Sequence, residues 1–429
     1  MEKLLKLATQ AADQAEVYYT ESTGDSIEFS DGKLDKADSS LSSGIALRVV
    51  KNGKMGLAHT RNLLDREDLL RQALTSAANG VQVNFQMPHT PQLPTLKTYS
   101  PNIARLQKQD LVARGNEVVA YIRRRLEGQV NVSFGYETSK EGILNSAGTA
   151  LSMAESVFYV LVNLVFPGTG SGLYHYKIGR DRVDLSQEEL DEQIELFLLS
   201  KNEIVPPTRK MPVIFTPFAS NALLSRFKVA SSPVNIHNKV SPLCGRTGEK
   251  IVSEKLSIWQ DPFDTEMTSS ANFDSEGTPT RKLTFIDKGV FTAIPTDLNY
   301  AEKLGLAPTG NGFRQSVEEL PSAHNFNLII GTGDVSLAEM IAGIREGLLV
   351  YNLMGAHSGN VLHGDYSVGV ASGFMIENGR ITGRVKDCML SGNAYETLSN
   401  IQAIENKCLN LGSSKIPSIL CSDVSVAGK

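Results

Sequence analysis

Cysteine is scarce in this sequence, with four residues among 429. They lie at positions 244, 388, 408 and 421, so no Cys-x-x-Cys pair is present and the common zinc-ribbon and redox motifs are excluded. The density is also far too low for a secreted scaffold held together by disulfides. We therefore expect buried free thiols in a cytoplasmic protein.

Long apolar runs are missing as well. The longest, residues 157–166, is interrupted by Asn163 and has the length of a strand, whereas a membrane-spanning helix needs about 18 or more apolar residues. Residues 1–16 form a predicted amphipathic helix without the apolar core or the cleavage site of a secretory signal. The sequence predicts neither a membrane partner nor export.

Clustered positive charge is scarce too. The net charge is −5, from 42 basic and 47 acidic residues, and nucleic-acid binding requires clustered cations that neutralise phosphates. The densest basic run, residues 123–125, ends a predicted helix, where arginines already oppose the negative end of the helix dipole. We expect no nucleic-acid partner.

Established catalytic motifs are also absent. Neither HExxH nor HExxxH occurs in the chain, although a zinc hydrolase needs two or three histidines with a carboxylate, usually held by a helix. The segment "GAHSGN" misses the Gly-x-Ser-x-Gly elbow by one position, and Cys388 lies in a strand-like stretch that predicts a buried thiol. "PGTGSG" and "GTGDVS" lack the residues of phosphate and dinucleotide loops. We predict no catalytic residue in this chain.

The segment "AHSGNVLHGDYSVGVASG" contains two of the seven histidines. His357, His363 and Asp365 have the residue types of a metal site. However, the two histidines are six positions apart in a glycine-rich loop, where nothing fixes their relative geometry. Solvent-exposed histidines that bind no metal are the preferred interpretation, and a metal held by His357 or His363 stays an alternative.

Alternating strands and turn dipeptides dominate what is present. Apolar alternation predicts strands over residues 15–21, 26–29 and 46–50. Helices are predicted over residues 66–78 and 108–126. Tight hairpins are predicted where turn residues suit left-handed backbone conformations, at Asp31-Gly32, Asn52-Gly53, Asp287-Lys288-Gly289 and Asn378-Gly379.

This pattern predicts an α+β fold with two domains. Residues 1–204 form a helix-and-hairpin N-terminal domain, and residues 211–429 form a β-rich C-terminal domain with a large mixed or antiparallel sheet. The proline-containing segment "EIVPPTRKMP" is the predicted linker. After it, "VIFTP" indicates a buried strand and "FASNALLSRFKVA" the helix that follows it.

Two segments with glycine beside a hairpin stand out, residues 273–291 and 364–383. Small residues allow close approach of a backbone, and an open strand edge can accept an extended peptide through main-chain hydrogen bonds. The residues alone fit a peptide groove and a purely structural hairpin equally well.

In these segments the sequence resembles the TldD/PmbA family, also described as modulators of DNA gyrase and as peptidase subunits. "DSEGTPTRKLTFIDKGV" is similar to the family's acidic-residue-Gly-Thr-Pro hairpin. "GNVLHGDYSVGVASGFMIENGRI" is similar to its Gly-Asp-Tyr/Phe-Ser hairpin ending in Ile-Glu-Asn-Gly, although His363 and the two residues before it depart from the pattern. "VSVAGK" resembles the family's terminal strand, so the match preserves order over essentially the whole chain.

The resemblance also indicates a branch. TldD-type members carry zinc-binding HExxxH on the helix after the first strand of the C-terminal domain. Here Ser225, Arg226 and Ala230 stand at those positions, and none is a conventional zinc ligand. The chain therefore resembles the PmbA branch, also called TldE, which lacks the metal.

The resemblance implies a subunit of a metalloprotease that hydrolyses unfolded peptides, as a heterodimer with a TldD-type homologue or as a homodimer. It implies no cofactor in this chain and a zinc ion in the partner subunit. The residues expected to shape the chamber and orient substrate are Asp274, Glu276, Gly277, Thr278, Gly364, Asp365, Tyr366 and Ser367. Two alternatives remain, a regulatory binding module without hydrolysis in a gyrase- or toxin–antitoxin-linked pathway, and an autonomous metal hydrolase.

Overall fold

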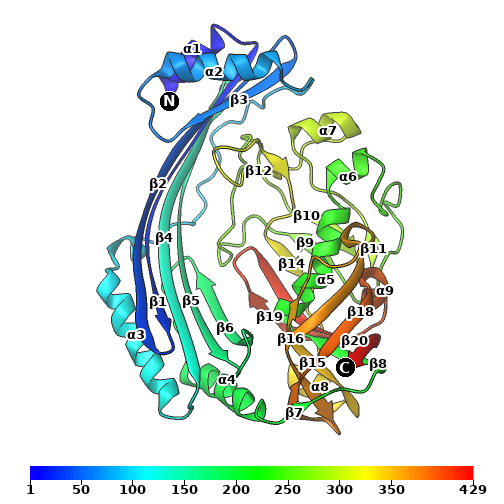
Figure 1. Cartoon of the computed structure of the whole chain (residues 1–429). Helices are drawn as coiled ribbons and strands as arrows, with labels where there is room; N and C mark the ends of the chain where they lie inside the picture. The colour runs from blue at the N-terminus through cyan, green and yellow to red at the C-terminus, as the bar shows by residue number, and fades with distance from the viewer. Residues whose placement is uncertain (429) are drawn as a thin grey trace.

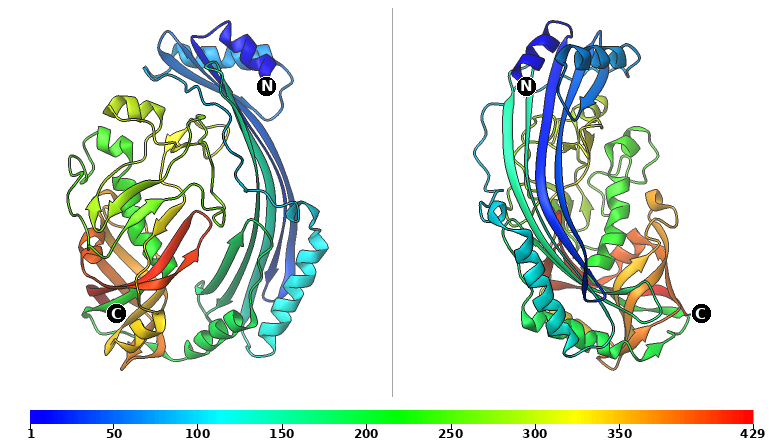
Figure 2. Two further views of the ribbon diagram at one scale, coloured as in Figure 1. Left: turned by 180° about the vertical axis from the view of Figure 1, so that it is seen from behind. Right: turned by 60° about the vertical axis from the view of Figure 1, so that its left-hand side comes forward.

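The computed structural model describes residues 1–428 and contains two large sheets (Figure 1). The N-terminal half forms a long curved sheet, whose concave side faces the more compact C-terminal half (Figure 2). No helix in the described residues is long and apolar enough to cross a membrane. The expected α+β architecture is confirmed.

Six antiparallel strands form the N-terminal sheet in the order β3-β2-β1-β4-β5-β6. They are β1 (Gln14–Ser30), β2 (Lys33–Lys51), β3 (Lys54–Thr60), β4 (Gln129–Asn145), β5 (Ala150–Val165) and β6 (Gly172–Gly179). Asp31 and Gly32 join β1 to β2 with φ angles of 48° and 72°. Positive φ at both central residues defines the tight hairpin turn that the sequence predicts at this position.

The strands run longer than their apolar pattern indicates. β1 has 17 residues and β2 has 19, and Ser22 to Asp25 continue the pairing through a polar stretch where the sequence predicts a break. Main-chain bonds to β2 on one side and to β4 on the other hold this stretch extended without any apolar face.

Four helices accompany the N-terminal sheet. α1 (Glu2–Thr9) and α2 (Arg66–Ala78) pack against one end of it, where Leu4, Val17 and Leu69 share an apolar cluster. α3 (Lys108–Arg123) lies on the convex side, and α4 (Gln187–Leu199) lies at the end nearer the C-terminal sheet. α2 matches its predicted bounds, whereas α3 ends three residues before the predicted 126. A short 3-10 helix, η1 (Ile103–Arg105), precedes α3.

Twelve strands form the mixed C-terminal sheet, with parallel pairs β14–β20, β8–β15 and β7–β17. The pairings β8–β15–β16–β18–β20–β8 form a closed cycle of strands. The bounds are β7 (Glu203–Ile204), β8 (Arg209–Phe215), β9 (Ile258–Gln260), β10 (Leu283–Asp287), β11 (Val290–Phe291), β14 (Leu328–Ile330), β15 (Glu346–Met354), β16 (Asp365–Glu377), β17 (Arg380–Val385), β18 (Cys388–Asn393), β19 (Ile401–Asn410) and β20 (Ser414–Gly428).

Short elements complete this half. β12 (Gly312–Phe313) and β13 (Ser322–Ala323) form a separate pair. The helices are α5 (Pro217–Ala230), α6 (Pro233–His237), α7 (Leu298–Leu304), α8 (Leu337–Ala342), α9 (Ala394–Ser399) and the 3-10 helix η2 (Val361–His363). α8 begins with a capping box, in which Ser336 accepts a hydrogen bond from the N–H of Glu339 and the Glu339 carboxylate accepts one from the N–H of Ser336.

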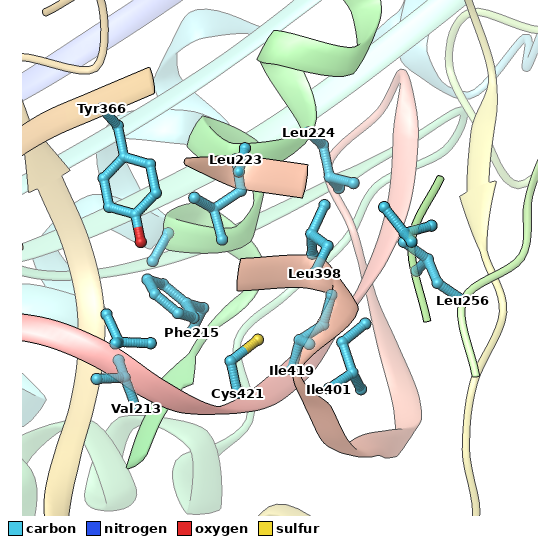
Figure 3. Packing of buried hydrophobic residues seen from close by; sticks show 14 of the residues in the cluster. Val213, Phe215, Leu223, Leu224, Leu256, Tyr366, Leu398, Ile401, Ile419 and Cys421 are labelled. Atoms are coloured by element: carbon cyan, nitrogen blue, oxygen red, sulfur yellow. The ribbon is translucent and has the colours of Figure 1, made fainter. Parts of the chain in front are cut away.

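The C-terminal core forms around α5. Leu223 and Leu224 of this helix pack with Phe215 of β8, and Tyr366 and Cys421 belong to the same cluster (Figure 3). The predicted strand and helix after the linker are therefore confirmed. All four cysteines are free, with Cys388 and Cys421 buried and the other two half-buried.

The two sheets share one apolar cluster. Val162 and Leu164 of β5 belong to the same cluster as Leu349 of β15 and Phe374 of β16. Both ends of the predicted linker belong to the C-terminal sheet, because Glu203 and Ile204 pair with β17 and residues 209–212 begin β8. The division into residues 1–204 and 211–429 stays a prediction.

Candidate functional site

The helix α5 occupies the place that the resemblance assigns to a metal-binding helix. It follows β8 directly, begins with Pro217, whose missing N–H costs nothing at the first position, and buries Leu223, Leu224 and Phe227. Arg226 and Ala230 on the same helix are completely buried. Their side chains and that of Ser225 supply no carboxylate, imidazole or thiolate, so this set does not fit a zinc ion.

Arg226 instead binds a loop. Its guanidinium donates to the carbonyl oxygens of Ala222 at 2.6 Å, Ser358 at 3.3 Å and Asp365 at 3.4 Å. It also lies over the Tyr366 ring, 5.8 Å from the centroid. Burial lowers the pKa of Arg226 from its ordinary value. The positively charged Arg226 side chain thus holds residues 358–365 against α5, and the carbonyl oxygens of the loop take the place of a carboxylate partner.

The predicted residues 364–367 lie in and just after this loop. Gly364 has φ of 95°, a left-handed conformation that ends η2, and it leads into β16. Asp365 and Ser367 are exposed, whereas Tyr366 is buried and its hydroxyl lies 2.8 Å from Oγ1 of Thr397. The exposed pair can face a ligand, and Gly364 and Tyr366 hold it in place.

The histidines of the same loop show no metal-binding arrangement. Nδ1 of His363 lies 3.3 Å from Oδ1 of Asn360, and Oδ1 of Asp365 accepts a hydrogen bond from Asn393 at 3.0 Å. Within residues 1–428 there is no group of three or more His, Cys, Asp or Glu side chains placed to hold a metal ion. The structure does not bring His357, His363 and Asp365 together as ligands.

The predicted residues 274–278 form a buried turn. The Asp274 carboxylate accepts hydrogen bonds from the N–H groups of Glu276, Thr278 and Gly312, each at 2.9 Å. Gly277 provides the positive φ of 78° that the turn requires. Burial and the nearby Glu276 raise the pKa of Asp274 well above its ordinary value.

Glu276 leads from this turn into a buried charge network that sequence reasoning missed. Arg48 of β2 donates to Glu276 at 2.7 Å and also pairs with Glu16 of β1. Arg314 donates to Glu16 at 2.7 Å. Burial raises the pKa of Glu276 to about 7 although Arg48 opposes this shift. Four nearly inaccessible charged side chains therefore join the N-terminal sheet to the C-terminal half.

The two predicted segments belong to different neighbourhoods. Residues 274–278 bond to β2 and to residues 297–314, whereas residues 364–367 bond to α5 and to the start of α9. No hydrogen bond within residues 1–428 joins the two segments. The substrate-binding role of all eight residues stays a prediction, and the geometry favours the exposed Asp365 and Ser367.

A second missed feature is an acidic strip on the face of the N-terminal sheet that meets the C-terminal half. The pairing of Glu155 with Ser139 places Glu155 on the same face as Glu137 and Glu141. Arg180 bridges this face to the C-terminal half, because it contacts Glu155 at 3.2 Å and donates to the carbonyl of Ser270 at 3.2 Å. Burial raises the pKa of Glu155 to about 7, although Arg180 opposes it.

This shift predicts a pH dependence of stability. The folded protein retains the Glu155 proton up to about pH 7, whereas the unfolded chain releases it near the ordinary value of 4.5. The stabilisation that protonated Glu155 contributes to the folded state is therefore complete below the unfolded-state pKa of 4.5. It is lost as pH rises through the folded-state pKa of about 7. We expect Glu155→Gln to reduce the fall in unfolding free energy between these pH values by about 2 kcal/mol, allowing for its partial exposure.

Urea denaturation at several pH values measures this effect. Glu195→Gln, on the exposed side of α4, is the matched control and is expected to keep the wild-type slope. Identical slopes for the Glu155 variant and the wild type would contradict the prediction.

Comparisons with known proteins agree with this architecture. The model described as "PmbA/TldA metallopeptidase C-terminal domain" matches residues 208–428, and "PmbA/TldA metallopeptidase domain 1" matches residues 15–79. A metalloprotease of Methanothermobacter thermautotrophicus is 28% identical over 399 residues, covering 88% of this chain and 85% of the relative. Metalloprotease PmbA of Escherichia coli O157:H7 is 25% identical over 442 residues, covering 99% and 94%.

A solved structure shows the same fold. The crystal structure of TldE from Thermococcus kodakarensis superposes with a TM-score of 0.90 at 23% sequence identity. The superposition covers 100% of both chains. The two-sheet arrangement of residues 1–428 is therefore a known architecture.

Proposed function

The chain belongs to the PmbA/TldD metallopeptidase family, and from that premise we propose that it is the non-zinc subunit of a two-subunit peptidase. In this role it shapes the chamber and orients unfolded peptides, while a TldD-type partner supplies the zinc ion and the hydrolytic chemistry. A homodimer with the same surface is the alternative assembly.

The observation that carries the proposal is the chemistry of α5. The helix that would hold the metal has Ser225, Arg226 and Ala230 at the ligand positions. A guanidinium is always charged and offers only donors, so it repels a divalent cation. The same guanidinium binds the carbonyls of Ser358 and Asp365, which supports a positioning role for α5 in place of a catalytic one.

The exposed part of the loop supports a role in substrate orientation. Asp365 and Ser367 open β16, and β16 pairs with β18 there, so their side chains are fixed by a strand ladder. A carboxylate and a hydroxyl on a rigid strand suit hydrogen bonding to the main chain of an extended peptide. We propose these two residues as the substrate contacts of this chain.

Reconstitution tests the proposal. The purified chain and a TldD-type homologue with HExxxH from the same genome are assayed separately and together on an unfolded peptide, with metal content measured in parallel. The mixture is expected to hydrolyse peptide at least about a hundredfold faster than either chain alone, because metal-assisted catalysis contributes several kcal/mol. A partner variant with glutamine in place of the HExxxH glutamate serves as the inactive control.

The other functions have distinct outcomes in the same assay. Chelator-resistant hydrolysis by this chain alone would overturn the proposal. Unchanged turnover and products on mixing would indicate a regulatory module without a part in hydrolysis. Metal bound to this chain and lost in His363→Ala would indicate an autonomous metal hydrolase.

A further inference from the structure

A cavity of about 320 Å³ lies between the two sheets at the N-terminal end of α5. Its walls come from β6 and α4 on one side and from α5, β15 and β19 on the other, the elements that face each other in Figure 1. Much of the lining is apolar or aromatic: Leu173, Tyr174, Tyr176, Leu196, Phe218, Leu337, Tyr351 and Leu409. The cavity has the size and lining of a small-molecule or side-chain site.

One buried polar atom in the lining has no partner. Gln193 of α4 is 7% exposed, and its Nε2 donates to the carbonyls of Leu173 at 2.7 Å and Val162 at 3.3 Å. Its Oε1 has no hydrogen-bond partner in residues 1–428. A buried acceptor without a partner costs about 1–3 kcal/mol, so the site favours a ligand that brings a donor.

The charges of the lining favour a cation. Glu189, Glu192 and Glu405 line the cavity with Lys407 as the single lysine. Burial lowers the pKa of His175, so that residue is neutral at pH 7. Burial opposes ionisation of Glu189, but hydrogen bonds from Lys177 and from the Ser186 backbone hold its pKa below the ordinary value. The charged lining residues sum to a net charge of minus two, and the ion pair of Lys177 with Glu189 at 2.7 Å reduces the net negative charge to one.

Two further groups bear on this balance. Burial raises the pKa of Tyr351 to about 12, and the carboxylates of Glu192 and Glu405 add to this shift. The N-terminus of α5, at Thr216 and Pro217, opposes it with about half a positive charge. Half a positive charge does not cancel the remaining full negative charge, and the aromatic faces add attraction for a cation.

The free edge of β6 runs beside the cavity. β6 is the last strand in the sheet order, and the carbonyl of Ser171, just before it, accepts from the N–H of Phe166, so the main-chain groups of Ser171 point toward β5. By alternation the main-chain groups of Leu173 and His175 also point toward β5, whereas Tyr174 and Tyr176, which line the cavity, direct their main-chain groups outward. An extended peptide can pair with such an edge and place a side chain in the adjacent cavity.

We propose that this cavity binds an ammonium or guanidinium group next to an apolar group, supplied by a basic side chain of an extended peptide. The peptide as carrier rests on the proposed function, whereas the preference for a cation rests on the lining alone. The experiment separates the two.

Calorimetric titration with phenethylamine and with 3-phenylpropionate tests the lining. The amine is expected to bind at least about tenfold more tightly than the acid, because their apolar parts match and their charges differ. Leu196→Trp fills the cavity and is expected to abolish binding of the amine. Glu192→Gln is expected to weaken it about fivefold, and Glu195→Gln on the same helix, outside the lining, to leave it unchanged.

Equal or tighter binding of the acid, no binding of either probe, or an unaffected Leu196→Trp variant would overturn the proposal. Acetyl-Gly-Phe-Lys-Gly-amide and its norleucine analogue then test the carrier. Displacement of phenethylamine by the lysine peptide, but not by its norleucine analogue, supports a peptide as the carrier of the cation. If phenethylamine binds but the lysine peptide does not displace it, the peptide carrier is overturned and the preference for a cation remains supported. This conclusion does not depend on the outcome of reconstitution with a zinc-bearing partner.

Discussion

Arg48→Met is expected to lower the free energy of unfolding by about 3–5 kcal/mol, because removing one partner of a buried ion network leaves uncompensated charge in the interior. The Arg48 side chain is 2% exposed and, within residues 1–428, is the only side chain that pairs with both Glu16 and Glu276. Without it Glu276 keeps one donor, the N–H of Leu298 at 2.7 Å. Urea denaturation followed by circular dichroism measures the loss.

A surface pair at the same junction provides the control. Arg61 donates to Glu318 at 3.1 Å, and the two side chains are 65% and 47% exposed. Arg61→Met is expected to change stability by no more than about 0.5 kcal/mol. Adding Glu276→Gln to Arg48→Met should recover part of the loss, since it removes one of the stranded charges. A loss below about 1 kcal/mol for Arg48→Met would show that the network is not what joins the two halves.

Arg226→Glu, which introduces the residue found at this position in HExxxH, is expected to cost about 3–5 kcal/mol. The new carboxylate would be completely buried and would face the carbonyl oxygens of Ser358 and Asp365. Anion and carbonyl dipoles repel each other, so the loop 358–365 should detach from α5. Unfolding experiments and limited proteolysis at this loop measure the two effects separately.

Two variants on the same helix complete this test. Asn221→Glu adds the same side chain at an exposed position and is expected to change stability by no more than about 0.5 kcal/mol. Arg226→Met removes the charge without reversing it, so the lost hydrogen bonds are partly offset by relief of a buried cation. If Arg226→Glu is as stable as Arg226→Met, the guanidinium does not hold the loop.

Local signals made much of the fold predictable. The hairpins at Asp31-Gly32 and Asn378-Gly379 follow from residues that accept positive φ, and the bounds of α2 follow from Asp65 at its N-cap and the apolar period after it. The continuous β1 was not predictable from its pattern, because bonds to neighbouring strands hold the polar stretch around Gly24 extended.

The site was less predictable because its contacts are long-range. Arg48 and Glu276 are 228 positions apart, and Arg314 and Glu16 are 298 apart. Each charged residue alone has the pattern of a solvated surface residue, and only the tertiary fold buries it. The resemblance singled out Glu276 and Asp274 but could not show that they lie inside the junction between the halves. The absence of ligands on α5 could be read from the sequence, whereas the loop contacts of Arg226 could not.

The position of β20 has a consequence for folding kinetics. Residues 414–428 pair with β8, β14, β18 and β19, and they close the cycle of strands. Strands synthesised some two hundred residues earlier must therefore wait, unpaired along one edge, until residue 428 has left the ribosome. Domains with such non-local pairing fold slowly and expose aggregation-prone edges meanwhile. The interval before β20 arrives is the period in which a nascent chain of this kind depends most on chaperones.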